Sequence, residues 1–104
     1  MDRRLSLHRE LLTVVGRRPF EVYFQPPTGT MIEYPCVIYE KDSGDSLYAN
    51  NHSYRYTQRY QVTVITREPD CTLPEELLRH FQMCRMDRQF VSDNLYHNVL
   101  VLYY

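Results

Sequence analysis

The sequence predicts an α+β fold, a two-layer sandwich in which two helices pack on one face of a mostly antiparallel sheet. Two segments carry apolar residues at helical spacing, and five carry the alternating or continuous apolar pattern of strands. Their order along the chain is α-β-β-β-α-β-β. The 104 residues contain no internal repeat, low-complexity tract or linker, so we expect a single domain over residues 1–104.

The first predicted helix runs from Asp2 to Val15. Its apolar residues recur every three or four positions, which is the spacing of one helix face. They are Leu5, Leu7, Leu11, Leu12, Val14 and Val15. Asp2 is suited to cap the first turn, and Gly16 fits the left-handed position that ends many helices. Pro19 then prevents the helix from continuing.

Two short strands are predicted next. Apolar and polar side chains alternate weakly over Phe20–Gln25, until Pro26 and Pro27 end the segment. Tyr34–Glu40 is rich in β-branched and aromatic residues. Pro35 has no amide hydrogen, so it should lie at the start of this strand or on a sheet edge.

A polar segment, Lys41–His52, should form an exposed loop, and long loops in small domains are often functional. The next strand, Ser53–Arg67, has Tyr and Val at even positions, whereas Arg, Thr and Gln occupy most odd ones. At about 3.3 Å per residue it would be about 45–50 Å long. Its tyrosine-rich first half is therefore expected to project beyond the core.

After a turn at Glu68–Cys71, a second helix is predicted from Thr72 to about Arg85. Thr72 and Glu75 have the spacing of a capping box, and Pro74 fits the first turn of a helix. The apolar face of this helix consists of Leu73, Leu77, Phe81 and Cys84.

The last two predicted strands are Arg88–Ser92 and His97–Tyr104, joined by a turn at Asp93–Asn94. Val99–Tyr104 is almost entirely apolar. It should therefore be a central strand or one that is covered on both faces.

The sequence shows no motif for catalysis or metal binding. Cys36, Cys71 and Cys84 are odd in number and widely spaced, which predicts buried neutral thiols in a reducing compartment and neither disulfides nor a zinc site. The three glycines are isolated, so no phosphate-binding loop is formed. We expect no enzymatic activity, cofactor or metal. No apolar run approaches the ~18 residues of a membrane span, so no membrane contact is expected.

The composition favours contact with other proteins. Ten tyrosines and eleven arginines accompany a single lysine, and both Tyr and Arg are enriched at protein interfaces. The formal net charge of −1 argues against a dedicated nucleic-acid binder. The charge is nevertheless segregated, because residues 1–20 sum to +3 and residues 68–76 to −4.

Opposite patches of this kind allow copies of one chain to pack head to tail. We predict that Arg17 and Arg18 of one copy contact the acidic segment of the next. That segment contributes Glu68 and Asp70 to the contact. Reversing the charges of Arg17 and Arg18 would then abolish assembly.

Three sequence motifs occur together, in this order, and indicate a resemblance to a known family. They are Tyr34-Pro35-x-Val37-Ile38-Tyr39; Tyr54-Arg55-Tyr56-x-x-x-Tyr60-x-Val62-Thr63-Val64-Ile65, ended by Arg67-Glu68-Pro69-Asp70; and Phe90-Val91-Ser92-Asp93-Asn94-Leu95-Tyr96-His97. With the two helices, they make the chain resemble, over roughly residues 3–103, the small tail-terminator and tail-completion proteins of long-tailed bacteriophages. The shared features are hydrophobic spacing and recurrent phrases, without catalytic residues.

The resemblance implies a structural virion protein that assembles as a homo-oligomeric ring of six subunits. Such a ring caps the tail tube protein, ends tube polymerisation and offers a surface to the head connector or stopper protein. DNA would pass through the lumen without specific binding. The protein would be found in the virion neck and, during assembly, in the host cytoplasm. The residues expected to contact a neighbouring subunit or the tube are Tyr48, Asn50, Asn51, Tyr54, Arg55 and Arg59.

Three alternatives remain open at this point. Neighbouring neck proteins, the connector stopper and adaptor, are similar in size. A small α/β nucleic-acid-binding module could stack bases on Tyr54, Tyr56 and Tyr60, although the alternation places the tyrosines and arginines on opposite faces. A small ligand-binding protein or thiol enzyme would need one of the cysteines to be reactive. His80 and Cys84 would be four residues apart on the predicted helix.

Overall fold

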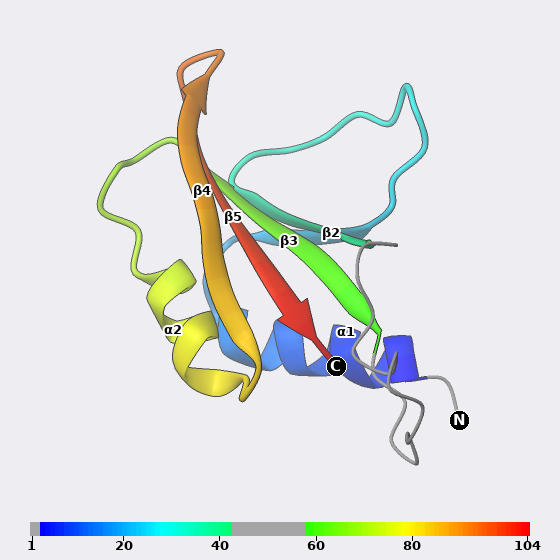
Figure 1. Ribbon diagram of the computed structural model, residues 1–104. Helices are drawn as coiled ribbons and strands as arrows, with labels where there is room; N and C mark the ends of the chain where they lie inside the picture. The colour runs from blue at the N-terminus through cyan, green and yellow to red at the C-terminus, as the bar shows by residue number, and fades with distance from the viewer. Residues whose placement is uncertain (1–2, 43–57) are drawn as a thin grey trace.

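The computed structural model describes residues 3–42 and 58–104 (Figure 1). Within these ranges the chain forms two helices and one five-stranded sheet, in the order α-β-β-β-α-β-β. The elements are α1 (Arg3–Val15), β1 (Glu21–Phe24), β2 (Cys36–Lys41), β3 (Arg59–Thr66), α2 (Leu73–His80), β4 (Cys84–Ser92) and β5 (Leu95–Tyr103). The predicted α+β class is confirmed.

The strands lie in the order β1-β2-β3-β5-β4. β1 is parallel to β2, and every other neighbouring pair is antiparallel. β5 lies between β3 and β4, so the apolar run at the end of the chain is an interior strand, as its composition predicted.

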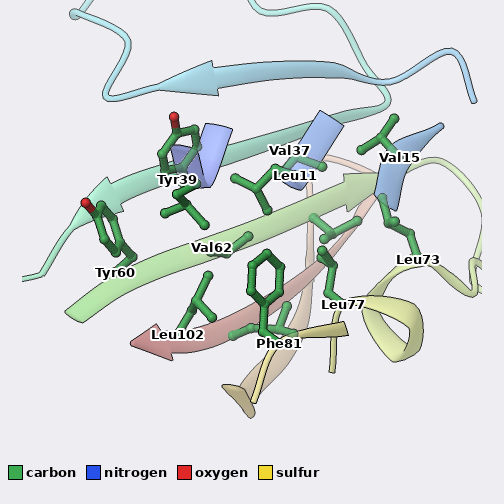
Figure 2. Packing of buried hydrophobic residues seen from close by; sticks show 13 residues of the cluster. Leu11, Val15, Val37, Tyr39, Tyr60, Val62, Leu73, Leu77, Phe81 and Leu102 are labelled. Atoms are coloured by element: carbon green, nitrogen blue, oxygen red, sulfur yellow. The ribbon is translucent and has the colours of Figure 1, made fainter. Parts of the chain in front are cut away.

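The main core lies between the helices and one face of the sheet (Figure 2). α1 contributes Leu7, Leu11 and Val15, and α2 contributes Leu73 and Leu77. The sheet residues that meet them are Val37, Tyr39, Tyr60, Val62, Val64, Leu100 and Leu102, with Phe81 between α2 and β4. The even positions of β3 therefore point into the core, as the alternation predicted.

A smaller cluster lies on the opposite face of the sheet. Cys36, Ile65 and Leu95 are buried there, and the partly buried Ile32 packs against them. Ile32 belongs to the connection between β1 and β2, so this connection covers one end of the face that carries no helix.

The second helix is shorter than predicted. α2 ends at His80, Phe81 is extended with φ −96° and ψ 139°, and β4 begins at Cys84 instead of Arg88. Cys84 and Met86 both pack against the main core from alternate strand positions. Leu73, Leu77 and Phe81 are four residues apart, which is also the spacing of one helix face, so the pattern predicted a longer helix. From Cys84 onward the chain instead pairs with β5.

The capping box was also wrong. The hydroxyl of Thr72 donates to Glu76 Oε2 at 3.0 Å and makes no hydrogen bond to the helix backbone, and Thr72 itself has helical dihedral angles. Glu75 is exposed. Pro74 does occupy the first turn, as predicted.

The remaining boundaries lie close to the predictions. Pro35 directly precedes β2, and β5 begins at Leu95, two residues earlier than predicted. Asp93 and Asn94 have φ values of 54° and 63°, as a tight two-residue hairpin turn requires. β3 begins at Arg59 in the described part of the chain, so the projecting first half predicted for this strand lies outside the described residues.

Candidate functional site

A cleft of about 470 Å³ lies where the end of α1, the start of β1 and the connection between β3 and α2 meet. It brings together Arg18, Glu68 and Asp70, three of the residues predicted to form an interface. The cleft is lined by Arg18, Pro19, Phe20, Pro35, Thr66, Arg67, Glu68, Asp70, Cys71 and Thr72. Charged residues of both signs and apolar residues therefore line the same cleft.

Arg18 joins the two helices. Its Nη2 atom forms an ion pair with Glu76, in the first half of α2. Its Nη1 atom donates to the carbonyl oxygens of Val14 and Val15, at 3.0 and 3.2 Å, and so satisfies acceptors at the end of α1. One basic and one acidic segment of the sequence thus lie side by side within a single chain.

The other charged residues at this end face solvent. Arg17, Glu68 and Asp70 are exposed, and their side chains form no ion pair within residues 3–42 and 58–104. The buried hydroxyl of Thr66 donates to the carbonyl oxygen of Glu68 at 2.7 Å, which holds the turn after β3. These three side chains remain available for a partner.

Arg59 lies at the start of β3, beside the point where the chain leaves the sheet. Asp42 N donates to Arg59 O at 2.9 Å, and Arg59 Nε lies 3.1 Å from Asp42 Oδ2. That N–H is not directed at an acceptor, so the side-chain contact is an ion pair and not a hydrogen bond. Gln58 and Tyr104 exchange two backbone hydrogen bonds of 3.1 Å. Asp42 and Arg59, which lie on either side of the undescribed residues, are therefore joined to each other, and Gln58 is joined to the end of the last strand.

The other residues that the family resemblance predicts to contact a neighbouring subunit or the tube fall within residues 43–57. Tyr48, Asn50, Asn51, Tyr54 and Arg55 lie outside the described residues.

A polar network that the sequence did not predict ties both helices to the end of β5. Tyr104 Oη donates to Glu10 Oε2 at 2.6 Å and lies 2.9 Å from Ser6 Oγ. His80 Nε2, at the end of α2, lies 3.0 Å from Glu10 Oε1. The hydrogen bond from Tyr104 is the main cause that lowers the pKa of Glu10, and His80 lowers it further against the opposing effect of burial.

Two of the three cysteines carry neutral thiols, and only Cys36 is fully buried; Cys71 and Cys84 are half-buried, not buried as predicted. Burial raises the pKa of Cys36 to about 11, and it raises the pKa of Cys84 to about 11 as well, so both thiols are protonated at neutral pH. Cys84 is in β4, so the spacing from His80 is not that of a helix face. Among the described residues, no group of three or more His, Cys, Asp or Glu side chains could hold a metal ion.

Tyr60 is part of the core and cannot stack bases. It is 2% exposed, and its ring centre lies 6.2 Å from that of Tyr39. Of the three tyrosines considered for base stacking, Tyr60 is the one that the structure describes. Its burial counts against the alternative of a nucleic-acid-binding module.

Large apolar side chains are exposed at several separate places in the described part of the chain. Met31, in the connection between β1 and β2, is 87% exposed, and Met83, just before β4, is 44% exposed. Leu5 and Leu12, on the outer side of α1, are 47% and 46% exposed, although the sequence assigned them to the buried stripe. Phe90 and Val91, in the β4–β5 hairpin, are 41% and 61% exposed. Figure 1 shows this hairpin extending beyond the helices. The sequence assigned neither pair to an interface.

Comparison with protein-family models, curated proteins and solved structures gave no match. No helix in the described ranges is long and apolar enough to cross a membrane. The resemblance to phage tail proteins therefore remains a prediction that rests on the sequence.

Proposed function

We propose that this protein is a structural subunit of a bacteriophage tail, a terminator that assembles as a ring on the finished tail tube. The ring ends polymerisation of the tube protein and provides the surface to which the head connector or stopper binds. The observation that carries the proposal is the exposure of large apolar side chains at separate places on one small domain. They include Leu5 and Leu12 on α1, Met31 in the connection between β1 and β2, and Phe90 and Val91 in the β4–β5 hairpin.

A closed ring requires two different surfaces on each subunit, because every copy contacts one neighbour on each side. Solvent-exposed apolar pairs such as Leu5 with Leu12 and Phe90 with Val91 would be covered in such an assembly. A chain of 104 residues has a small core, and contact with neighbours would add buried area to it.

The charged rim of the cleft has a different role in the proposal. Glu68 and Asp70 line the same cleft as Arg18, which already pairs with Glu76 within one chain, and the exposed Arg17 directly precedes Arg18. Because Arg18 is already paired within its own chain, we assign this rim to a partner along the tail axis, the tube or the connector, and not to the predicted contact with a neighbouring copy. The protein belongs to the virion neck in this proposal, and DNA passes through the ring lumen without specific binding.

Two of the three cysteines, Cys36 and Cys84, are unsuited to thiolate chemistry at neutral pH. Cys36 is completely buried, and both it and Cys84 are protonated at neutral pH. The proposal is accordingly a role in assembly, without catalysis.

Electron microscopy of the purified protein tests the ring. We expect negatively stained rings with a central hole, and a mass by light scattering that is a whole multiple of 12.6 kDa. Monomers at every concentration up to the millimolar range would contradict the proposal.

A tube-length assay separates a terminator from a stopper or adaptor. Tail tube protein is polymerised with and without the purified chain, and tube lengths are measured by microscopy. A terminator stops growth, so tubes should be shorter and carry a ring at one end. Glu68→Lys with Asp70→Lys should weaken tube or connector binding without dissolving the rings. Glu75→Lys, which changes another exposed carboxylate on α2, is the control. Unchanged tube lengths with the unmodified chain would exclude the terminator role.

A further inference from the structure

The two outermost strands, β1 and β4, each have one edge without a partner strand in the described part of the chain. Following the pairings across the sheet shows that β1 and β4 run in opposite directions. A second copy beside the first, with its helices on the same side, would thus bring its β1 antiparallel to β4. Simple head-to-tail repetition of this fold therefore continues the sheet with an antiparallel joint.

The two halves of β4 differ in how well they can accept a strand. The first half carries Arg85, Asp87 and Arg88, and its pairing with β5 is interrupted by an irregularity between Met86 and Arg88. Charges and bulges are the devices by which edge strands avoid pairing. The outer half, Gln89–Ser92, has no charge and a regular register with β5.

The backbone of β1 offers two outward-facing residues. Glu21 N and Gln25 N donate toward the β2 side, to carbonyl oxygens 3.4 and 2.9 Å away. Because the direction of main-chain groups alternates along a strand, Val22 and Phe24 turn their N–H and C=O groups away from β2. They form the unpaired edge of β1.

The outer half of β4 offers a matching pair. The two-residue turn makes Ser92 and Leu95 the hydrogen-bonded pair that closes the hairpin. Alternation then directs the main-chain groups of Gln89 and Val91 away from β5. Each edge thus has two residues, with one residue between them, whose main-chain N–H and C=O groups point outward.

We propose that the outer half of β4 binds β1 of a second copy, with Val91 opposite Val22 and Gln89 opposite Phe24 of that copy. This inference deepens the proposed ring and rests on it. All four side chains lie on the helix side of their sheets, as their pairing with Val37, Tyr39, Tyr96 and Asn98 shows. The two sheets therefore join without turning either copy over.

The same register matches the side chains on the other face. Phe90 faces Tyr23 of the second copy, which is an aromatic pair of the kind that stabilises neighbouring strands. Phe90 already stacks on His97, with ring centres 4.6 Å apart, so the contact would extend an existing row of rings. Val91, which is more exposed than Phe90, would be covered.

The symmetry of the contact favours the β1 edge over a second β4. Pairing between two β4 edges would be isologous and would end at a dimer, whereas pairing of β4 with β1 is heterologous, as the proposed ring requires. Because the two edges lie on opposite sides of the sheet, each copy uses both, and the contact can close into a ring.

Substitution at Val91 tests the edge. Val91→Pro removes an outward N–H without removing a hydrogen bond to β5, so rings should dissociate to monomers while circular dichroism keeps the spectrum of the folded protein. Val91→Ala keeps that N–H and is the matched control, which should retain the rings. Rings that persist in Val91→Pro would overturn the proposed contact and leave the ring itself standing.

A disulfide tests the register. The double variant Tyr23→Cys, Phe90→Cys places two thiols directly opposite each other across the joint, within the Cα separation that a disulfide needs. Mild oxidation should give a ladder of covalent multimers on a denaturing gel, and the top band counts the subunits. Each single variant, and the unmodified chain with its own three cysteines, should remain monomeric on the same gel.

The outcomes for the contact and for the ring can be told apart. Rings in the unmodified protein without a covalent ladder in the double variant would overturn the register. Absence of rings in the unmodified protein would overturn the proposed function, and the inference with it.

Discussion

Tyr104 illustrates how much of this fold depends on single side chains that the sequence does not connect. Its hydroxyl donates to Glu10 and lies beside Ser6, and its ring meets Phe81 edge-on at 6.2 Å. The sequence places Ser6 and Glu10 one helical turn apart, and it places Tyr104 at the end of an apolar strand. Nothing local indicates that these segments meet. Only the packing of α1 against the end of β5 makes the network.

Tyr104→Phe should destabilise the protein by about 1 kcal/mol, because it removes a partly buried hydroxyl that makes two hydrogen bonds. The free energy of unfolding in urea measures the change. Tyr103→Phe is the control, since no hydrogen bond of the Tyr103 hydroxyl to another described residue is present. Equal losses in both variants would show that the network contributes nothing.

The same network predicts how stability responds to acid. The folded pKa of Glu10 lies below its ordinary value of 4.5, chiefly because of Tyr104. Its contribution is therefore complete above pH 4.5 and is lost as the pH falls through the lowered folded value. Urea unfolding between pH 3 and 6 should show a smaller acid-side loss in Tyr104→Phe than in the unmodified protein. An identical pH dependence in the two proteins would refute this assignment.

At the scale of the elements, periodicity predicted how many there are and failed at their ends. Six apolar residues in α1 cover more of the helix than the sheet can bury, so the pattern could not separate Leu7 and Leu11 from Leu5 and Leu12. α2 ends early because the residues after His80 gain more from pairing with β5 than from another helical turn. Competition of this kind between distant segments is not visible in a local pattern.

Two adjacent leucines on α1 test which face is buried. Leu11→Ala should cost about 2–5 kcal/mol, because the side chain is completely buried in the main core. Leu12→Ala, at a position that is 46% exposed, should cost less than about 1 kcal/mol in the unassembled chain. Thermal unfolding at low protein concentration measures both. A larger loss for Leu12→Ala would mean that α1 packs with the other face inward.

At the scale of the whole molecule, the sequence predicted the class and order of the elements but not the strand order. Local patterns do not show that β5 inserts between β3 and β4, or that β1 pairs in parallel with β2. The cleft has the same origin, since Arg18 and Glu76 are 58 positions apart in the chain. Charge segregation did identify both segments of the cleft wall. It could not show that they meet within one copy.

The contacts between the residues around Asp42 and those around Gln58 predict that the segment between them can be replaced by a short turn without loss of the fold. Replacing residues 44–56 by a four-residue Gly/Asn turn should leave the melting temperature within a few degrees, because the flanking strands are already held together. In the proposed function the same variant should lose binding to tail tubes. Sedimentation with preassembled tubes measures that loss. Collapse of the melting transition would show that the fold depends on this segment.

The two-residue turn at Asp93 and Asn94 also bears on the order in which the chain folds. Ser92 and Leu95 meet across this turn, whereas the residues paired between β3 and β5 lie from 30 positions apart, at Thr66 and Tyr96, to 44 apart, at Arg59 and Tyr103. Closing a short loop costs less entropy than closing a long one. The β4–β5 hairpin is therefore the segment that can form first. β3 can then pair with the free edge of β5 before the helices pack against the sheet.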